Sequence, residues 1–389
     1  MSAHALSRDA ARRIVAAVVA AEIARLRDPA LAPVGAGDWP DALPLGDAGL
    51  GLDSIEQIGA LGALAETFDL DDAALPAETA QYVGDWLDVI ISHHASGDGR
   101  IVVMTSGSTG RSQPHAHALA DLLDEAAFFA ERLPACRRVV ALVPAHHLYG
   151  LIWTALLPDV LDVPVVARTL GAPLRLAAGD LVVAVPDQWQ AMLRLSRRFP
   201  TGIVGVSSAA PLDDHIAEDL MAAGLSRLVE IYGSSETSAI GWRELPAPAF
   251  TLLPRWHWLP DNGADWRIAD DRGTAQSLPD HIERVGERAL RPIGRRDGVV
   301  QVGGHNVSPT RVAEVLRTVG GVADAAVRLH HDGRLKAFIV PVTDNDPAAL
   351  AALIQQRAAA RLTVPQQPRH LRFGTALPRN AMGKLEDWS

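Results

Sequence analysis

The feature that most constrains the fold is an alternation of short, continuous apolar runs with helical patterns between residues 101 and 231. Strands buried on both faces of a parallel sheet have this composition. The helical patterns at 187–198 and 213–223 are long enough to serve as crossovers between parallel strands. We therefore predict an α/β domain with a parallel-strand sheet. Its expected strands are residues 101–104, 139–143, 163–166, 181–185, 203–206 and 228–231.

Polar segments follow four of these runs. TSGSTG (105–110) lies between a strand and a helix expected from about Pro114, and its glycines, hydroxyls and N–H groups can surround phosphate oxygens. No lysine follows as in a P-loop, so a plain polar turn is the alternative for this segment alone. The others are PAHHLYG (144–150), SSAAP (207–211) and YGSSE (232–236). Because open α/β sheets bind ligands at the carboxyl ends of their strands, we expect one site there.

Taken in order, these motifs resemble the adenylate-forming superfamily of acyl-CoA synthetases, peptide-synthetase adenylation domains and luciferases. The likeness covers about residues 99–389 and includes GRRD (294–297) and LPRNAMGK (377–384). It implies an ATP- and AMP-binding ligase that converts a carboxylic acid to an acyl-adenylate with ATP and Mg²⁺. The acyl group would then pass to a thiol. Magnesium, a hydroxyl-rich loop and a mobile lysine suit the charge that builds on the phosphates.

The resemblance also assigns roles to single residues. It implies catalytic roles for Lys384, His147 and Glu236, with Glu236 as the metal ligand. Nucleotide contacts would come from Thr105, Ser106, Gly107, Ser108, Thr109, Gly110, Ser208, Ala209, Tyr232, Gly233, Ser235, Asp280 and Arg295. Substrate contacts would come from Tyr149, Ser207 and Gly233, and Asp297 would be a hinge. For Lys384 the alternative is an exposed tail lysine.

The chain departs from the family pattern at two loops. Gln113 stands where the family's phosphate loop has lysine, and Arg111 could replace that charge. Gln301 and Asn306 stand where basic residues are common, which weakens an inference of tight binding to the phosphates of CoA.

The larger departure is at the front, where about a hundred residues of helical character replace a usual subdomain. The adenylation core is therefore abridged, and homo-oligomerisation would cover what is left exposed. The segment around Gly51–Ile55 is similar to an acyl carrier protein, which makes Ser54 a candidate phosphopantetheine site. The alternative is that Asp53 and Ser54 cap a helix of a scaffold.

We thus predict three segments. Residues 1–98 form the helical, carrier-like or scaffold segment, 99–296 the adenylation core, and 297–389 a small mobile α+β domain. In the last we expect helices at 309–319 and 347–362, a hairpin of 325–329 with 335–340, and a strand at 370–373.

Short synthetases of this kind resemble ligases of xanthomonadin and aryl-polyene pigment biosynthesis, which load 3-hydroxybenzoate onto an acyl carrier protein. The favoured prediction is therefore a hydroxybenzoate-like aryl acid and a phosphopantetheine thiol on a carrier protein. Free CoA is the alternative acceptor. A non-catalytic nucleotide-binding or carrier module is the alternative of another class.

Composition limits the remaining choices. The net charge of −10 favours neither nucleic acid nor an anionic membrane as partner. The single cysteine, Cys136, excludes a disulfide framework, and the apolar run 14–21 is too short to span a bilayer, so we expect a cytoplasmic protein. From the sequence we do not expect the histidine pairs 115/117, 146/147 and 330/331 to bind metal, because neither HxxxH spacing nor a carboxylate partner in the pattern supports it.

Overall fold

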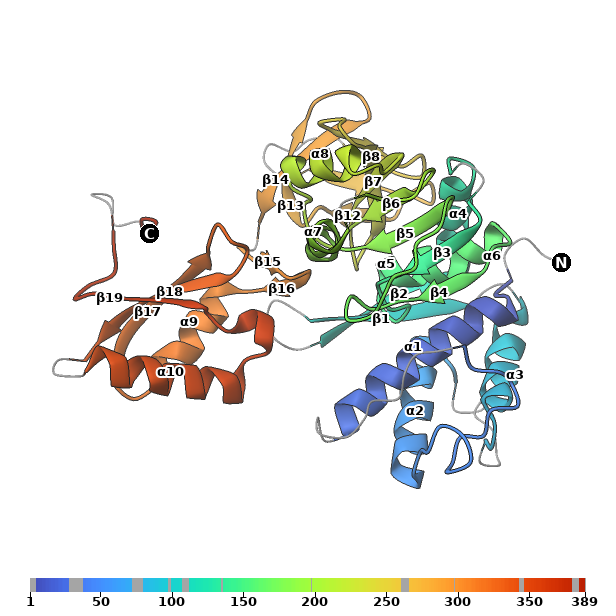
Figure 1. Cartoon of the computed structure of the whole chain (residues 1–389), viewed down its shortest axis with the longest axis horizontal. Coiled ribbons are helices and arrows are strands. Elements are labelled where there is room, and N and C mark those ends of the chain that lie inside the picture. Colours follow the sequence, from blue (N-terminus) through green and yellow to red (C-terminus); the bar gives the residue numbers. More distant parts are fainter. Residues whose placement is uncertain are drawn as a thin grey trace. The chain divides into compact units, whose positions relative to one another are not determined.

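The computed structural model describes residues 5–27, 38–71, 80–96, 99–106, 112–133, 136–196, 198–259, 266–296, 298–342, 346–379 and 385–388. The chain divides into two compact units (Figure 1), the first formed by residues 1–105 and 113–254 and the second by 106–112 and 255–389. The three-segment division drawn from the sequence has different boundaries and stays a prediction.

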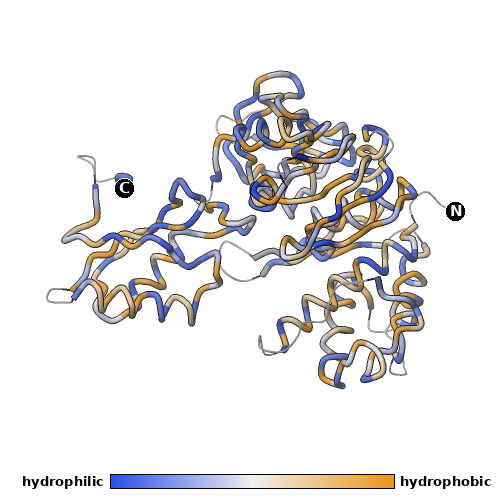
Figure 2. The backbone as a smooth tube through the Cα atoms, viewed as in Figure 1, coloured by the Kyte–Doolittle hydropathy of each residue, from blue (hydrophilic) through white to orange (hydrophobic). Residues whose placement is uncertain are grey.

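The first unit is built on a sheet whose strands follow the order β9-β8-β7-β6-β5-β3-β4. The pairs from β4 to β7 are parallel, whereas β8 and β9 add antiparallel strands. The predicted α/β class with a parallel sheet is therefore confirmed, and Figure 2 shows hydrophobic residues along these strands. The strands are β3 (Arg138–Ala141), β4 (Val165–Ala167), β5 (Asp180–Ala184), β6 (Val204–Ser207), β7 (Arg227–Ser234), β8 (Ser238–Glu244) and β9 (Phe250–Leu252).

The predicted strand at 101–104 forms, but it does not join the large sheet. β1 (Arg100–Ser106) pairs with β2 (Ser112–Ala118) in a separate two-stranded sheet. The helix expected from about Pro114 is wrong, because α4 begins only at Leu119 (Leu119–Ala130). The segment SQPHAHA alternates larger and smaller side chains with a period of two, and a proline is tolerated in an edge strand.

Helices cover both faces of the sheet. On one face α7 (Pro186–Leu195) and α8 (Asp214–Ala222) share a core with the strands through Trp189 and Leu220. On the other, the π-helical turn η3 (Ile152–Leu156) and α6 (Leu157–Val160) contact α4, and α5 (Leu148–Leu151) contacts η3. All five side chains of η3 are buried.

The N-terminal segment packs within the first unit. It comprises α1 (Arg8–Leu26), α2 (Ser54–Thr67), α3 (Val83–His93) and η2 (His94–Ser96). Ser7, the N-cap of α1, donates to Asp159 at 2.6 Å, and Arg13 donates to the carbonyl oxygen of Ala155 at 3.1 Å. Six successive side chains, 14–19, are buried, so α1 has packed neighbours on more than one side. No helix in the described ranges is long and apolar enough to cross a membrane.

The second unit begins with short antiparallel strands that the sequence patterns did not predict. They are β10 (His257–Trp258), β11 (Arg267–Ala269), β12 (Ala275–Ser277), β13 (Asp280–Arg284), β14 (Ala289–Arg295), β15 (Val300–Val302) and β16 (His305–Val307). Most are only three to five residues long, so no sustained hydrophobic period marks them.

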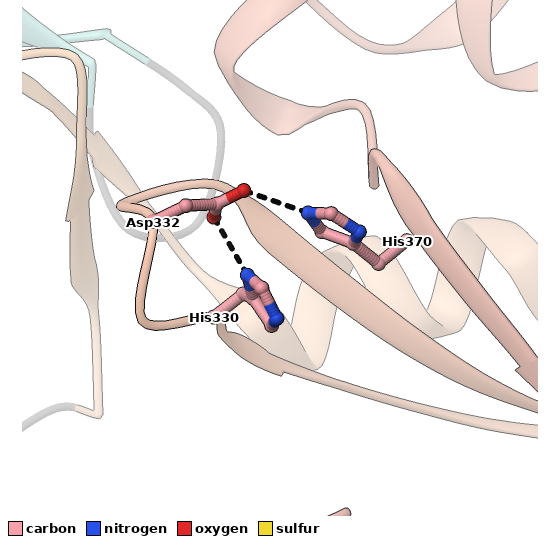
Figure 3. A group of neighbouring side chains, drawn as sticks. All are labelled: His330, Asp332 and His370. Carbon is pink, nitrogen blue, oxygen red and sulfur yellow. Dashed lines mark hydrogen bonds and ion pairs between the residues drawn. The ribbon is translucent and has the colours of Figure 1, made fainter. Parts of the chain in front are cut away.

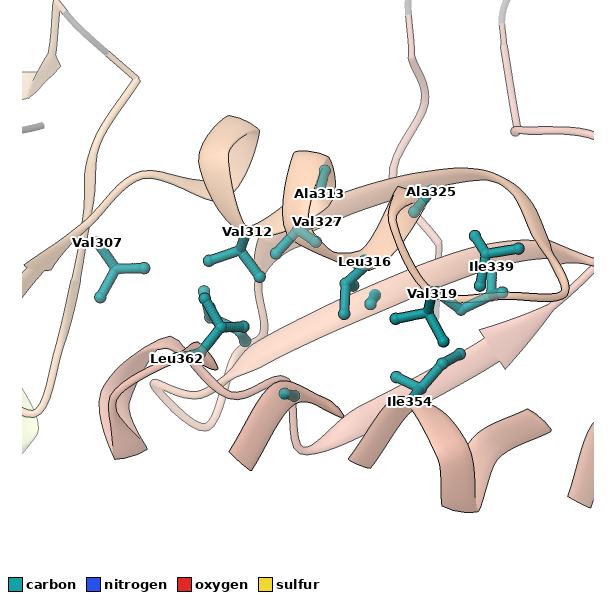
Figure 4. Close-up of a cluster of buried hydrophobic side chains, with 14 of the residues drawn as sticks. Val307, Val312, Ala313, Leu316, Val319, Ala325, Val327, Ile339, Ile354 and Leu362 are labelled. Atoms are coloured by element: carbon teal, nitrogen blue, oxygen red, sulfur yellow. The ribbon is translucent and has the colours of Figure 1, made fainter. Parts of the chain in front are cut away.

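A small α+β domain ends the second unit and confirms the pattern expected after residue 309. β17 (Val322–Leu329) pairs antiparallel with β18 (Leu335–Pro341), and β19 (His370–Phe373) pairs parallel with β18. Helices α9 (Pro309–Arg317) and α10 (Pro347–Arg361) and the turn η4 (Val364–Gln366) complete it. Figure 4 shows the core between helices and sheet, which includes Leu316, Ile339 and Ile354.

Candidate active site

The carboxyl ends of β5 and β6 are tied together by one tyrosine. The hydroxyl of Tyr149, in α5, lies 3.1 Å from the carbonyl oxygen of Ala184 and 2.9 Å from that of Val206. Burial raises the pKa of Tyr149 well above its ordinary value, so the phenol stays protonated and donates. The hydroxyl of Tyr149 is thus used by the fold, and only its ring is left for the predicted substrate contact.

The loop after β3 carries His147, and a glycine sets its path. His147 is the exposed N-cap residue of α5. A Cβ at Gly150 would lie 2.0 Å from the carbonyl oxygen of Pro144, so only glycine fits beside the start of the loop. This close approach explains why glycine ends the segment PAHHLYG, six positions after Pro144.

The neighbouring His146 has a different environment from His147. Burial lowers the pKa of His146, and a hydrogen bond with the backbone of Ala17 in α1 raises it by a smaller amount. The two imidazole centroids are 4.1 Å apart. One histidine of the pair is therefore tied to the N-terminal helix, while the other is exposed at the predicted site.

The end of β6 places three predicted site residues. Ser207 is fully buried, and its Oγ has no hydrogen-bond partner among the described residues. Ser208 Oγ donates to the carbonyl oxygen of Ile231 at 3.0 Å, which joins this end to β7. Ala209 has a φ of +74°, a left-handed conformation that costs an L-residue about 1–2 kcal/mol. A buried hydroxyl without a partner carries a desolvation cost that a bound polar group would remove.

The YGSSE segment forms the end of β7 and the turn to β8. A Cβ at Gly233 would lie 2.3 Å from the carbonyl oxygen of Ser238, so glycine is required there by the hairpin itself. The ring of Tyr232 packs against Phe250 with centroids 5.6 Å apart. The carboxylate of Glu236 is about half exposed, at 51%. An exposed carboxylate oxygen is a ligand that Mg²⁺ accepts together with water and phosphate oxygens, so Glu236 fits the metal role.

Two histidines of β2 approach this segment, which the sequence patterns did not predict. His117 Nε2 lies 2.8 Å from the carbonyl oxygen of Ser235, and His115 Nε2 lies 3.9 Å from Glu236 Oε1. The separation of two positions puts both imidazoles on one side of a strand. That signal becomes readable only once residues 112–118 are known to be a strand.

A buried carboxylate was also missed. Glu125 of α4 is 3% exposed, and its Oε2 accepts the N–H of Ala239 in β8 at 3.2 Å. Leu122, Ala126 and Phe129 lie on the same buried stripe of the helix. A charged residue inside an apolar stripe was the signal that could have identified it.

In the second unit the hairpin β13–β14 brings two predicted nucleotide contacts together. Asp280 and Arg295 are register partners across the hairpin. The hairpin therefore brings these two residues opposite each other although they are fifteen positions apart in the sequence.

Several predicted residues lie outside the described ranges. Gly107, Ser108, Thr109, Gly110, Asp297 and Lys384 belong to this group, and the side chains of Thr105 and Ser106 are also outside it. The segment with Lys384 is flanked by described residues, since Arg379 and Leu385 form an antiparallel bridge.

Comparison with known proteins identifies the class. No family model matches the chain. A 4-coumarate–CoA ligase of Rhodobacter capsulatus is 39% identical over 399 aligned positions, covering 97% of this chain and 99% of that protein. One of Halorhodospira halophila is 38% identical over 348 residues, covering 86% and 87%.

Solved structures share the fold. An o-succinylbenzoate CoA synthetase from Bacillus subtilis, bound with a product analogue, has a TM-score of 0.59 at 19% identity and covers 73% of this chain and 67% of its own. A malonyl-CoA ligase complex with methylmalonyl-CoA and AMP has a TM-score of 0.55 at 22% identity and covers 72% and 71%.

The fold and the ordered motifs define an adenylate-forming enzyme. The full-length similarity is more specific, and the chain belongs to the adenylate-forming acyl-CoA ligase superfamily, a class of AMP-forming acid–thiol ligases.

Proposed function

We propose that the protein activates an aryl carboxylic acid with ATP and Mg²⁺ and transfers the acyl group to the thiol of CoA. The observation that carries this proposal is the near full-length similarity to 4-coumarate–CoA ligases, which are named for a carboxylic acid that bears an aromatic ring. The unpartnered hydroxyl of Ser207 supports it, because a polar group of the acid could pair there.

The proposed reaction has two steps. A carboxylate oxygen of the acid attacks the α-phosphorus of ATP, and the bond to pyrophosphate breaks. The thiol sulfur then attacks the acyl carbon, loses its proton, and displaces AMP. Bound Mg²⁺ would neutralise charge on the phosphates. In this proposal Lys384 stabilises the charge of the first step, His147 orients the acid, and Glu236 holds the metal.

The remaining predicted contacts form the nucleotide site in this proposal. Asp280 and Arg295, which face each other across one hairpin, would bind the ribose side of the nucleotide. Further nucleotide contacts would come from the strand ends, namely from Ser208, Ala209, Tyr232, Gly233 and Ser235. Residues 105–110 would hold the phosphates.

The decisive test of adenylation is pyrophosphate exchange with a panel of acids. We expect exchange with 4-coumarate or with 3- or 4-hydroxybenzoate. Lys384→Ala should abolish it, whereas Lys384→Arg should retain part of it because the positive charge remains. Absence of exchange with every acid would favour the non-catalytic module, and full exchange in Lys384→Ala would remove that residue from the mechanism.

The same panel decides the acid. A hydroxybenzoate is shorter than a hydroxycinnamate by a two-carbon spacer, so one pocket cannot bind both equally well. Ser207→Ala should reduce the preference for hydroxylated over unhydroxylated acids by about tenfold, the effect of losing one hydrogen bond. An unchanged preference would show that Ser207 does not contact the acid.

A carrier-protein thiol is the second candidate acceptor. Gln301 of β15 and Asn306 of β16 are register partners, and the Nε2 of Gln301 donates to Asn306. These neutral side chains occupy positions where the family often has basic ones. Thioester formation should be measured with CoA, with pantetheine and with a phosphopantetheinylated carrier protein. A carrier preferred over CoA by tenfold or more would overturn the CoA proposal.

Modification of Ser54 is a separate proposal. Asp53 is the N-cap of α2 and forms a capping box with Glu56, while Ser54 is exposed. The packing of α1 against Asp159 and Ala155 favours the scaffold interpretation of this segment. Incubation with CoA and a phosphopantetheinyl transferase, followed by intact mass measurement, tests it. An added phosphopantetheine that is absent in Ser54→Ala would favour the carrier interpretation.

A hinge at Asp297 is also proposed, because the two half-reactions need different groups at one site. Asp297→Pro should slow thioester formation more than adenylation, and Asp297→Ala, which keeps the backbone free, should slow it less. Equal loss of both half-reactions in the proline variant would contradict the hinge.

A further inference from the structure

We propose that His330, Asp332 and His370 form a binding site for a divalent transition-metal ion in the small C-terminal domain, independent of the proposed active site (Figure 3). One donor atom from each residue lies within 4.8 Å of the other two. Two imidazoles and one carboxylate are the donor set that zinc and related ions take.

The backbone holds these side chains from two directions. His330 follows β17 and Asp332 lies in the turn to β18, whereas His370 begins β19. The turn is closed by a hydrogen bond from the N–H of His330 to the carbonyl oxygen of Arg334, at 2.7 Å. The parallel pairing of β18 with β19 places His370 at the level of Lys336. The cluster therefore joins residues about forty positions apart.

The side chains already point at one another. Asp332 Oδ1 is 2.8 Å from His330 Nδ1, and Asp332 Oδ2 is 2.7 Å from His370 Nε2. Ligand atoms bound at about 2.0–2.1 Å to a tetrahedral ion lie about 3.3 Å apart. An ion would thus need these pairs to separate by only about 0.6 Å, a small side-chain rotation.

The site is accessible from solvent and has room for further ligands. The side chains of Asp332 and His370 are 39% and 46% exposed. Three protein ligands leave a fourth position of a zinc ion to water. His331 lies beside the site, with its ring centroid 3.9 Å from that of His330.

A metal here would act on the edge of a sheet. In the order β17-β18-β19, β19 is an edge strand bonded to β18 alone among the described strands of that sheet. A bridge from the turn to the first residue of β19 would tether this edge, so metal binding should stabilise the domain. Without an ion, the carboxylate is hydrogen-bonded to His370 and lies within ion-pair distance of His330.

The test uses the full-length protein without an affinity tag, treated with chelator and then dialysed. Zn²⁺ binding is measured by calorimetry, and Co²⁺ binding by the visible absorption of the bound ion. We expect one site that Asp332→Asn and His370→Gln each weaken by about tenfold or more. His215→Gln, which removes a highly exposed imidazole of α8, is the matched control and should bind as the parent does.

Thermal unfolding gives a second readout that a hydrogen-bonded cluster would not share. Zn²⁺ should raise the melting temperature of the parent and of His215→Gln but not of His370→Gln. Equal Zn²⁺ affinity in the parent and in both cluster variants would overturn the proposal. So would Co²⁺ spectra that the two substitutions leave unchanged. Circular dichroism of each variant establishes that loss of binding is not loss of fold.

Discussion

At the scale of single residues, the loop with His147 requires glycine at position 150, because glycine has no Cβ. The predicted Cβ contact at Gly150 is with a backbone oxygen, which cannot rotate away as a side chain can. Relief therefore requires the loop from Pro144 to Gly150 to move, and His147 lies within it. The role proposed for His147 thus depends on a position with no functional group of its own.

Gly150→Ala should lower the free energy of unfolding by about 1–3 kcal/mol, because the backbone must shift to remove the overlap. It should also slow pyrophosphate exchange by moving His147. Gly62→Ala is the control, since nothing lies within 4 Å of a Cβ added to this glycine of α2. The prediction fails if Gly150→Ala melts and reacts like the parent.

At the scale of elements, α1 is held by charge as well as by apolar packing. Asp41 accepts from Arg8 at 2.7 Å and from Arg12 at 2.8 Å. Arg8 also donates to Asp88, near the middle of α3, at 2.7 Å. Hydrogen bonds from Arg12 and Arg8 lower the pKa of Asp41 below its ordinary value of about 3.9.

The lowered pKa predicts a loss of stability in acid. The contribution of Asp41 is present above its ordinary pKa and disappears as the pH falls through the lower value of the folded state. Between about pH 6 and pH 3, Asp41→Asn should lose about 0.5 kcal/mol less than the parent, the size typical of partly exposed ion pairs. Denaturant titrations at each pH measure this. Asp47→Asn, an exposed position without an ion pair among the described residues, should follow the parent.

The tail beyond Lys384 is a second element held by specific contacts. Trp388 is 6% exposed and packs edge-on against Phe338 of β18, with centroids 5.7 Å apart. Lys336 donates to the carbonyl oxygen of Trp388 and lies 2.9 Å from Asp387. The hydrogen bond from Lys336 lowers the pKa of Asp387. The tail after Lys384 is therefore anchored to the small domain.

Trp388→Ala should destabilise the small domain by about 3 kcal/mol and reduce adenylation, because the segment with Lys384 loses one anchor. Leu316→Ala, in the core of the same domain, should cost similar stability without releasing the tail. Both variants are compared by pyrophosphate exchange at a temperature at which both are folded. Equal exchange rates would show that the tail does not position Lys384.

At the scale of the whole molecule, the N-terminal segment packs on the helical layer that contains η3, within the same unit. Ile14 and Val19 of α1 are fully buried, and α1 contacts the buried turn η3. Removing residues 1–98 would expose these apolar surfaces of the remaining chain to water.

Residues 99–389 alone should therefore be insoluble or partly unfolded, as judged by size-exclusion chromatography and circular dichroism. Adding residues 1–98 as a separate chain during refolding should restore part of the soluble fraction. A soluble truncated protein with parental secondary structure and pyrophosphate exchange would instead identify the segment as a detachable module, as the carrier interpretation requires.

The sequence predicted elements best where a hydrophobic period was sustained. Five of the six apolar runs became strands of the large sheet, and the α+β pattern after residue 309 was found as expected. Residues 112–118 were misassigned, because a short polar segment around Pro114 has no apolar period and its strand depends on pairing with β1. The short strands between 257 and 307 were missed for the same reason.

The order of motifs and the family were determined by sequence, because spacing such as PAHHLYG reflects local backbone geometry. Tertiary structure alone decided that the hydroxyl of Tyr149 contacts carbonyl oxygens at the ends of two strands. It also decided that the N-cap of α1 is hydrogen-bonded to Asp159. It also decided that Asp332 lies between His330 and His370. The physical reason is that these contacts join residues far apart in the chain. Only the strand order and the packing of helices on the sheet bring such residues within hydrogen-bonding distance.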